Sequence, residues 1–304
     1  MSRIQRRRFL QFASSTLATL GLSQLDIQKA GDSLGRVLAQ STPRKLALLV
    51  GINKYRDFPL NGCITDVLLQ KQLLIHRFGF NPKDILLLTD EQATRQGILT
   101  AFEEHLIKQA KPGDVVVFHF SGHGSQVQDP DCDSAPDCLN STFVPVDSFL
   151  PTGYPNQGGI VEDIMGHTLF LLMYALQTEN VTVVLDSCHS GGGTRGNFKV
   201  RSRGGGSQLK PVATEQEYQQ QWLQRLKLSP DEFKRLRRLG VAKGVVIAST
   251  KPDQLAADVP FSDFFAGAFT YLMTQYLWQQ AGSESFARVL PNVARSTTRL
   301  SFTK

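Results

Sequence analysis

Apolar runs alternate with amphipathic stretches along most of the chain. Short runs of apolar residues, typical of buried parallel strands, occupy five segments: Lys45–Ile52, Ile85–Leu88, Val115–Phe120, Val181–Leu185 and Gly244–Ala248. Between them, apolar positions recur at helical spacing in Cys63–Phe78, in a stretch that Thr94 can cap, and in Gly166–Leu176. This succession predicts an α/β fold, a three-layer sandwich whose mostly parallel central sheet carries helices on both faces.

Two segments interrupt the alternation. Residues 126–140 are rich in Asp, Pro and Ser, and a loop of that length is usually functional or disordered. Residues 191–211 are rich in Gly and Arg and almost free of apolar residues, which predicts a mobile connection. A further helix is expected beyond it, opened by Ser229 and Pro230 and closed by Gly240.

Two short motifs follow apolar strands at the points where those strands should end. The first is His119-Phe120-Ser121-Gly122-His123-Gly124, and the second is Asp186-Ser187-Cys188-His189-Ser190-Gly191-Gly192. Open α/β sheets bind ligands outside the carboxyl ends of their strands. A histidine and a cysteine delivered to neighbouring strand ends are the base and the nucleophile of a cysteine hydrolase. An isolated Cys188 would be read as a small buried apolar residue, but its glycine-rich context and the matching histidine motif favour the nucleophile.

The positions of the two histidines in the first motif indicate which of them is the base. His119 lies inside the apolar run and is expected to be packed, whereas His123 lies between glycines beyond the strand end and can reach a neighbouring strand. His123 is therefore the predicted base for Cys188. The backbone amides of Gly124 and Cys188 are the expected donors to an oxyanion, which is usually the largest stabilising contribution in acyl transfer.

Composition narrows the class of protein. The chain has 304 residues, of which 41% are hydrophobic and 20% charged, so a sizeable core is expected. The net charge of +6 is concentrated before residue 40 and in residues 195–243, and the remainder, which carries both motifs, is net negative. With no RNA- or DNA-binding signature, a nucleic-acid partner is not expected. No apolar run approaches the length of a membrane span. The chain is also expected to be a monomer.

The first residues resemble a twin-arginine export signal. Gln5-Arg6-Arg7-Arg8-Phe9-Leu10-Gln11 precedes a modest apolar stretch, and Val37-Leu38-Ala39 offers a cleavage site. Residues 1–42 are thus expected to form a signal and linker that direct the chain to the periplasm or another extracytoplasmic space. The competing interpretation is a basic, frayed amphipathic N-terminus on a cytoplasmic protein.

A metal site and a thiol redox function both fit the sequence less well than a cysteine hydrolase does. His119 and His123 have the spacing of a zincin pair, but Phe120 stands where a zincin has Glu, and a strand followed by glycine is the wrong context. Cys132 and Cys138 could join a zinc cluster or pair as a disulfide. A thiol redox protein would carry a C-x-x-C motif, which the sequence lacks.

Several co-ordered motifs together resemble a known family. They are VGINKY with GCITD, then SGHG, then DSCHSGG, and finally ASTKPDQLA followed by GAFT, spread from about Lys45 to Gln280. This set resembles the caspase-like cysteine peptidases, specifically the metacaspases and the bacterial orthocaspases. The resemblance implies a caspase–hemoglobinase-type sandwich in which residues 43–190 are a catalytic, large-subunit-like region. Residues 191–211 would be a processing linker, and residues 212–304 a small-subunit-like region that completes the same domain.

The resemblance also implies roles for single residues. The family's dyad falls on His123 and Cys188, and its acidic specificity site on Asp66 and Asp186. Carboxylates beside the nucleophile would pair with an Arg or Lys side chain. Helix capping by Asp66 and loop anchoring by Asp186 are the structural alternatives. The expected function is an endopeptidase that cleaves proteins or peptides after Arg or Lys, and a non-catalytic caspase-like binding or scaffold module is the alternative.

Self-processing and calcium are further expectations. Exposed basic residues in the predicted linker could enter an active site that accepts Arg or Lys: Arg195, Lys199, Arg201 and Arg203. The cysteine chemistry requires no cofactor. The resemblance implies a calcium site at Asn140, Glu162 and Asp163, although Asn140 removes one charge from it. An acidic loop could compensate or could simply be solvated: Asp129, Asp131, Asp133 and Asp137.

Overall fold

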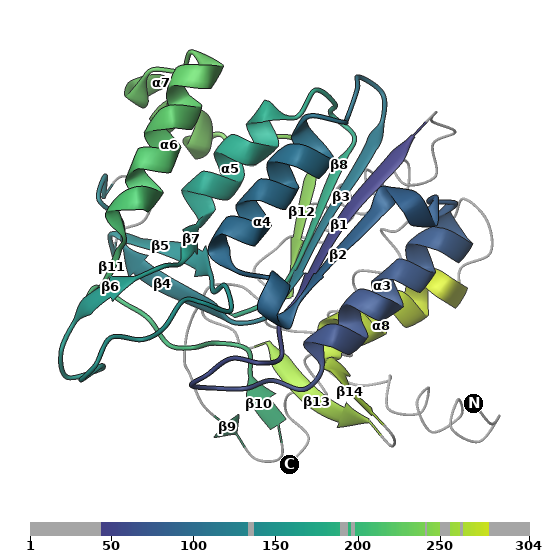
Figure 1. The fold of residues 1–304 in the computed structure, drawn as a ribbon, viewed down its shortest axis with the longest axis horizontal. Helices are drawn as coiled ribbons and strands as arrows, with labels where there is room; N and C mark the ends of the chain where they lie inside the picture. Colours follow the sequence, from purple (N-terminus) through teal and green to yellow (C-terminus); the bar gives the residue numbers. More distant parts are fainter. Residues whose placement is uncertain are drawn as a thin grey trace.

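A computed structural model describes most of the chain after the N-terminal segment (Figure 1). The described residues are 44–132, 137–188, 194–195, 198–240, 242–249, 256–261 and 264–279, with only the backbone described at 194, 195 and 198. The twin-arginine-like segment lies outside them, so export stays a prediction. None of the described helices combines the length and the apolarity that a membrane span needs.

The centre of the fold is a five-stranded sheet in the order β12-β8-β3-β1-β2, with every neighbouring pair parallel. Its strands are β1 (Lys45–Gly51), β2 (Ile85–Thr89), β3 (Val115–Ser121), β8 (Val181–Asp186) and β12 (Val245–Ala248). These are the five segments that the apolar runs predict. The α/β class with a mostly parallel central sheet is therefore confirmed.

Side chains alternate between the two faces of this sheet, and each face is covered by helices. Leu46, Leu48 and Val50 of β1 belong to one apolar cluster, whereas Ala47 and Leu49 belong to the other. The first cluster packs on α4 (Arg95–Ala101), the π-helical turn η3 (Phe102–Ile107) and α5 (Gly166–Ala175), and the second on α3 (Cys63–Phe78) and α8 (Ala268–Gln279). Figure 1 shows α3 and α8 together on one side and α4 with α5 on the other.

The two N-terminal caps that the sequence predicts, Thr94 and Ser229, are present. The Thr94 hydroxyl accepts a hydrogen bond from Gly97 N at 3.0 Å, and Ser229 accepts one from Glu232 N at 3.2 Å. Two outer helices lie beyond α5, namely α6 (Ala213–Leu226) and α7 (Pro230–Arg238). Short 3₁₀ turns η1 (Pro82–Asp84) and η2 (Asp90–Gln92) flank β2.

Smaller sheets gather at the carboxyl ends of the central strands (Figure 1). One is antiparallel, with β4 (Gly124–Gln128), β5 (Leu139–Phe143) and β7 (Ile164–Met165). A parallel pair joins β6 (Gly159–Val161) to β11 (Leu209–Pro211). A third sheet contains β9 (Thr194–Arg195), β10 (Phe198–Val200), β13 (Ala257–Phe261) and β14 (Phe264–Gly267).

The segment 198–211 differs from the exposed, mobile connection that its composition predicts. β10 pairs antiparallel with β13, β11 pairs with β6, and the side chains of Arg201 and Arg203 between them are buried. A Cβ on Gly205 would lie 2.4 Å from Gln126 N, so glycine here permits close backbone contact. The prediction of mobility is wrong for these residues because the glycines allow packing and the arginines are ion-paired.

The ion pair between Arg95 and Glu215 links α4 to α6, and removal of one partner should destabilise the fold. Glu215 is fully buried and also accepts a hydrogen bond from Met165 N at 2.9 Å. We expect Arg95→Ala to lower the free energy of unfolding by about 3–5 kcal/mol, because an uncompensated carboxylate would stay buried. Urea denaturation measures this. Arg44→Ala, which breaks the part-exposed pair with Asp84, is the matched control with an expected loss of about 0–1 kcal/mol. Equal losses in the two variants would contradict the argument.

Candidate active site

The histidine and cysteine motifs meet at one edge of the central sheet. β3 and β8 are parallel neighbours, and Ser121 pairs with Asp186 at the last position of the ladder. His123 and Cys188 each lie two residues beyond that pair, on loops that leave adjacent strand ends. Their exposed fractions are 1% and 0%. The structure therefore brings these two predicted residues to the same edge and buries both.

His123 is held by backbone and side-chain contacts around its ring. Its Nε2 lies 2.6 Å from the carbonyl oxygen of Phe58, and its backbone amide donates to the Tyr55 hydroxyl at 3.0 Å. That hydroxyl donates in turn to Val144 O at 2.8 Å, and the two rings lie 4.5 Å apart between centroids. Burial lowers the pKa of His123 to about 4. The imidazole is consequently neutral at pH 7 and able to accept a proton.

The two amides predicted to bind an oxyanion converge on one oxygen atom. Gly124 N donates to the carbonyl oxygen of Arg201 at 3.1 Å, and Cys188 N donates to the same oxygen at 2.9 Å. A carbonyl held between two backbone donors beside a cysteine is in the geometry that polarises it for attack. In the structure, the two amides that the sequence predicts as oxyanion donors are therefore both bonded to the carbonyl of Arg201.

The side chain of Arg201 is fully buried among three carboxylates. Its Nη1 lies 2.7 Å from Asp66 Oδ2 and 3.2 Å from Asp186 Oδ2, and its Nη2 lies 2.9 Å from Asp258 Oδ1. We call Asp66, Asp186 and Asp258 the three-carboxylate site. Ser121 completes it, because its hydroxyl accepts from Nη1 at 2.7 Å and donates to Asp66 at 2.6 Å.

Backbone and hydroxyl donors orient the first two carboxylates. Gly267 N donates to Asp66 Oδ1 at 2.9 Å. Asp66 does not cap α3, because the N-cap residue is Gly62 and no side chain caps this end. The hydroxyl of Thr270 donates to Asp186 Oδ2 at 2.7 Å. Asp186 therefore combines the predicted ion pair with the alternative anchoring role.

Charge in this site is unbalanced, with one guanidinium facing three acidic groups. Burial raises the pKa of Asp66 to about 6, and the neighbouring charge of Arg201 opposes that rise. Two such carboxylates would disfavour each other's ionisation without a cation between them. The site is therefore suited to binding a positively charged side chain.

Sequence reasoning missed part of this arrangement. Ser121 and Thr270 lie within the quoted motifs SGHG and GAFT but received no role, and Tyr55 likewise lies within VGINKY. Asp258 lies in β13, which no periodic pattern marks, so the sequence carried no signal for it. His119, expected to be packed, is fully buried in β3, and burial lowers its pKa to about 4.

Of the other predicted linker residues, Lys199 and Arg203 lie outside the three-carboxylate site. Lys199 donates through Nζ to the carbonyl of Pro59 at 2.7 Å, at the surface. Arg203 is buried but pairs with Asp163, at 2.8 Å between Nη2 and Oδ1. For Arg195 the structure describes the backbone in β9, and its side chain lies outside the described part.

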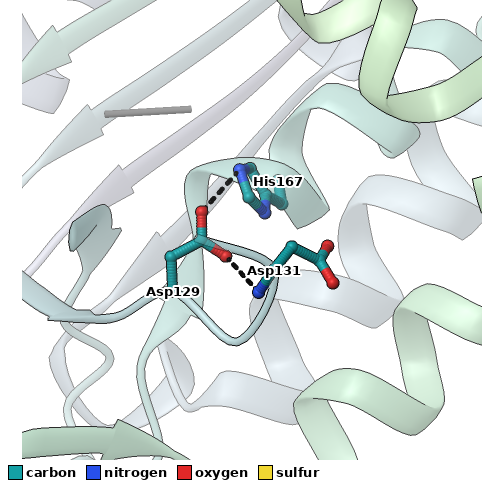
Figure 2. A group of neighbouring side chains, drawn as sticks. All are labelled: Asp129, Asp131 and His167. Carbon is teal, nitrogen blue, oxygen red and sulfur yellow. Dashed lines mark hydrogen bonds and ion pairs between the residues drawn. The ribbon is translucent and has the colours of Figure 1, made fainter. Parts of the chain in front are cut away.

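The acidic loop after the first motif contacts its own backbone and side chains of α5 and α7 (Figure 2). Asp129 accepts from Asp131 N at 3.1 Å and lies 3.6 Å from His167 Nε2. Arg237 places its Nη2 3.6 Å from Asp131 and also contacts the His167 ring, so a cation already lies against this cluster. Asp133 lies outside the described residues. Cys132 and Cys138 form a disulfide rather than a zinc cluster.

Fold and site together define a caspase-like α/β domain, in which a histidine loop and a cysteine loop follow adjacent strands of a parallel sheet. A protein from Geobacter sulfurreducens of known crystal structure shares the fold, with a TM-score of 0.52 over 83% of this chain and 89% of the other, at 20% identity.

Sequence comparisons give the family. Residues 45–194 match the metacaspase, peptidase C14 domain family. Metacaspase-1 of Schizosaccharomyces pombe is 35% identical over 168 residues, which are 53% of this chain and 37% of the relative. Metacaspase-1 of Sclerotinia sclerotiorum is 38% identical over 158 residues, 49% of this chain and 34% of the relative. The chain thus spans about a third of the length of these relatives, and its segment 45–194 belongs to the metacaspase family.

Proposed function

We propose that the chain is a cysteine endopeptidase that cleaves after Arg or Lys and processes itself at the Arg201–Ser202 bond. A single observation carries this proposal. The carbonyl of Arg201 receives the amides of Gly124 and Cys188 while its side chain reaches the three-carboxylate site. The internal segment thereby lies as a bound substrate would lie.

The chemistry is acyl transfer through a thioester. His123 takes the proton of the Cys188 thiol, and the sulfur attacks the carbonyl carbon of Arg201. The amides of Gly124 and Cys188 stabilise the negative oxygen that forms. The carbon–nitrogen bond to Ser202 breaks as His123 returns the proton to the leaving amine, and water then hydrolyses the thioester to a carboxylate and the free thiol.

Burial of the dyad in this state means that an outside substrate cannot reach it. Cys188 and His123 are almost inaccessible, and the residues on both sides of Arg201 are bound in place. Binding of an external polypeptide requires the segment around Arg201 to leave. The uncut chain is therefore a latent form, and departure of this segment is the activating event.

Purified wild-type protein compared with Cys188→Ala tests the proposal. We expect the wild-type chain to yield two fragments, with Ser202 as a new N-terminus identified by mass spectrometry, and the variant to stay intact. Cys63→Ala is the matched control, since burial raises the pKa of this second thiol and disfavours its thiolate. A folded wild-type chain that neither cuts itself nor hydrolyses a fluorogenic arginine peptide would instead favour a scaffold module. Identical fragments in Cys188→Ala would exclude self-processing.

Activity should depend on pH through Asp66. Burial raises its pKa to about 6 while Arg201 is seated, and the neighbouring charge of Arg201 opposes that rise. Once the guanidinium has left, the pKa of Asp66 is higher still, so lowering the pH protonates it and removes a negative charge from the emptied arginine site. We expect KM for an arginine peptide to rise about tenfold below the transition, as one charge-assisted contact is lost. Asp66→Asn should show a high KM without this transition, whereas Asp84→Asn, in the part-exposed pair with Arg44, should keep the wild-type profile. An unchanged profile in Asp66→Asn would contradict the assignment.

A further inference from the structure

A second buried arginine lies two residues beyond the carbonyl at the candidate active site. Arg203 is 4% exposed, and its backbone amide donates to Gly124 O at 3.1 Å. Its Nη2 contacts both oxygens of Asp163, at 2.8 and 2.9 Å, and its Nη1 donates to the carbonyl and the hydroxyl oxygens of Ser148, each at 3.0 Å. This is a bidentate guanidinium–carboxylate pair in a closed setting.

Both carboxylate oxygens of Asp163 accept hydrogen bonds in this arrangement. It is completely buried, and besides Arg203 it accepts hydrogen bonds from Thr142 Oγ1 at 2.7 Å and Ser148 Oγ at 2.6 Å. These donors come from β5 and from the connection that follows it, not from the linker. The Asp163 site, defined as Asp163, Ser148 and Thr142, is therefore part of the domain, and Arg203 is its ligand.

This arrangement does not fit the calcium ion that the family resemblance implies. Both oxygens of Asp163 face a guanidinium, and the side-chain oxygen of Asn140 accepts from Gly166 N at 2.9 Å. Glu162, the third residue of that expected set, is exposed. Two of the three residues expected to bind a cation, Asp163 and Asn140, therefore serve an arginine and a backbone amide in this state of the chain.

We propose that the Asp163 site is a subsite on the leaving-group side of the scissile bond that binds the arginine side chain two residues after it, and that Arg203 in this subsite keeps the linker seated. The inference rests on the proposed cleavage after Arg201. Arg201 and Arg203 then hold the chain on both sides of the bond. After thioester formation the Ser202 amine stays beside Cys188 and can attack the thioester, which re-forms the amide and releases the thiol.

Peptide binding to non-cleaving protein tests the subsite directly. The probe is a fluorescein-labelled peptide with the sequence of residues 198–203, Phe-Lys-Val-Arg-Ser-Arg, and a second probe has Ala at its sixth position. Both are titrated by fluorescence anisotropy onto the full chain carrying Cys188→Ala, Arg201→Ala and Arg203→Ala, which empties both sites. We expect the sixth-position arginine to strengthen binding about 10- to 100-fold, and Asp163→Asn in the same background to abolish that difference.

A third probe separates this proposal from the proposed function. Replacing the fourth-position arginine of the peptide by Ala tests the three-carboxylate site alone. If that change has no effect, the proposed specificity fails, whatever the sixth position does. If the fourth position matters and the sixth does not, the specificity survives and the subsite is overturned.

Retention of the linker is measured on a chain that keeps Arg201, so it does not depend on the triple variant. In Cys188→Ala protein, Arg203→Ala should loosen the internal segment and increase the apparent affinity for the first probe at least about tenfold. Arg203→Lys should give a smaller gain, because an ammonium group cannot form the bidentate pair. Lys210→Ala, an exposed basic residue of β11, is the matched control and should change nothing. No gain in Arg203→Ala, with thermal unfolding showing that the protein is folded, would overturn the retention role.

Discussion

The variant Arg201→Gln is expected to leave the chain uncut, with Cys188 reachable from outside. Glutamine keeps the length of most of the side chain but offers a neutral amide to three carboxylates. Losing one partner of a buried ion pair costs about 3–5 kcal/mol, which corresponds to slower self-processing by at least about 100-fold. The measurement is the rate of fragment appearance in purified protein, with iodoacetamide modification of Cys188 as a second readout.

Lys199→Gln is the matched control for this result. It removes a positive charge from the same segment, but its ammonium group donates to the carbonyl of Pro59 at the surface. We expect its processing rate to stay within about threefold of wild type, since exposed polar contacts contribute little. If Lys199→Gln slowed processing as much as Arg201→Gln, the total positive charge of the segment would set the rate. Binding of Arg201 by the three carboxylates would then not be the cause.

The second large effect is expected at Gly267, where β14 ends beside the three-carboxylate site. A Cβ at this position would lie 2.1 Å from Asp186 Oδ2 and 2.6 Å from Arg201 Nη1. Gly267→Ala therefore cannot coexist with a seated arginine in the observed geometry. We expect self-processing and cleavage of an arginine peptide to fall about 100-fold or more, because the overlap displaces the guanidinium from its carboxylates.

A double variant separates this overlap from general damage to the fold. When Gly267→Ala is added to Arg201→Gln, the guanidinium is absent and the Asp186 carboxylate can shift. We expect the thermal unfolding temperature to drop clearly less in that background than in the wild-type chain, which is a coupling between contacting positions. Equal drops in both backgrounds, or a fully active Gly267→Ala enzyme, would show that the close approach is unimportant.

Much of the fold follows from sequence patterns because the central strands are buried on both faces. Such strands appear as continuous apolar runs, and all five runs correspond to strands of the central sheet. Helix ends were also readable, since Thr94 and Ser229 cap their helices through local hydrogen bonds. Local chemistry of this kind does not depend on distant parts of the chain.

Only part of the candidate active site could be predicted from the sequence, because some of its contacts join distant parts of the chain. His123 and Cys188 stand at strand ends marked by glycines, and parallel pairing places those ends together. Asp258 joins Asp66 across almost two hundred residues of sequence, through Gly62 N and the seated guanidinium. No local pattern encodes such a contact. The composition of the linker was misleading, because glycine and arginine are common both in mobile segments and in closely packed, ion-paired ones.

The pairing of β10 with β13 bears on which polypeptides the proposed peptidase could accept. Lys199 and Val200 meet Asp258 and Ala257 through an antiparallel ladder, so the residues before the seated arginine are held by main-chain groups. A guest chain that took this place would have to add itself as an extra strand at the sheet edge. A helix or a tight turn cannot do so without unravelling. Proteins with basic residues in unstructured tails or open loops would accordingly be cut first, and compactly folded ones would be spared.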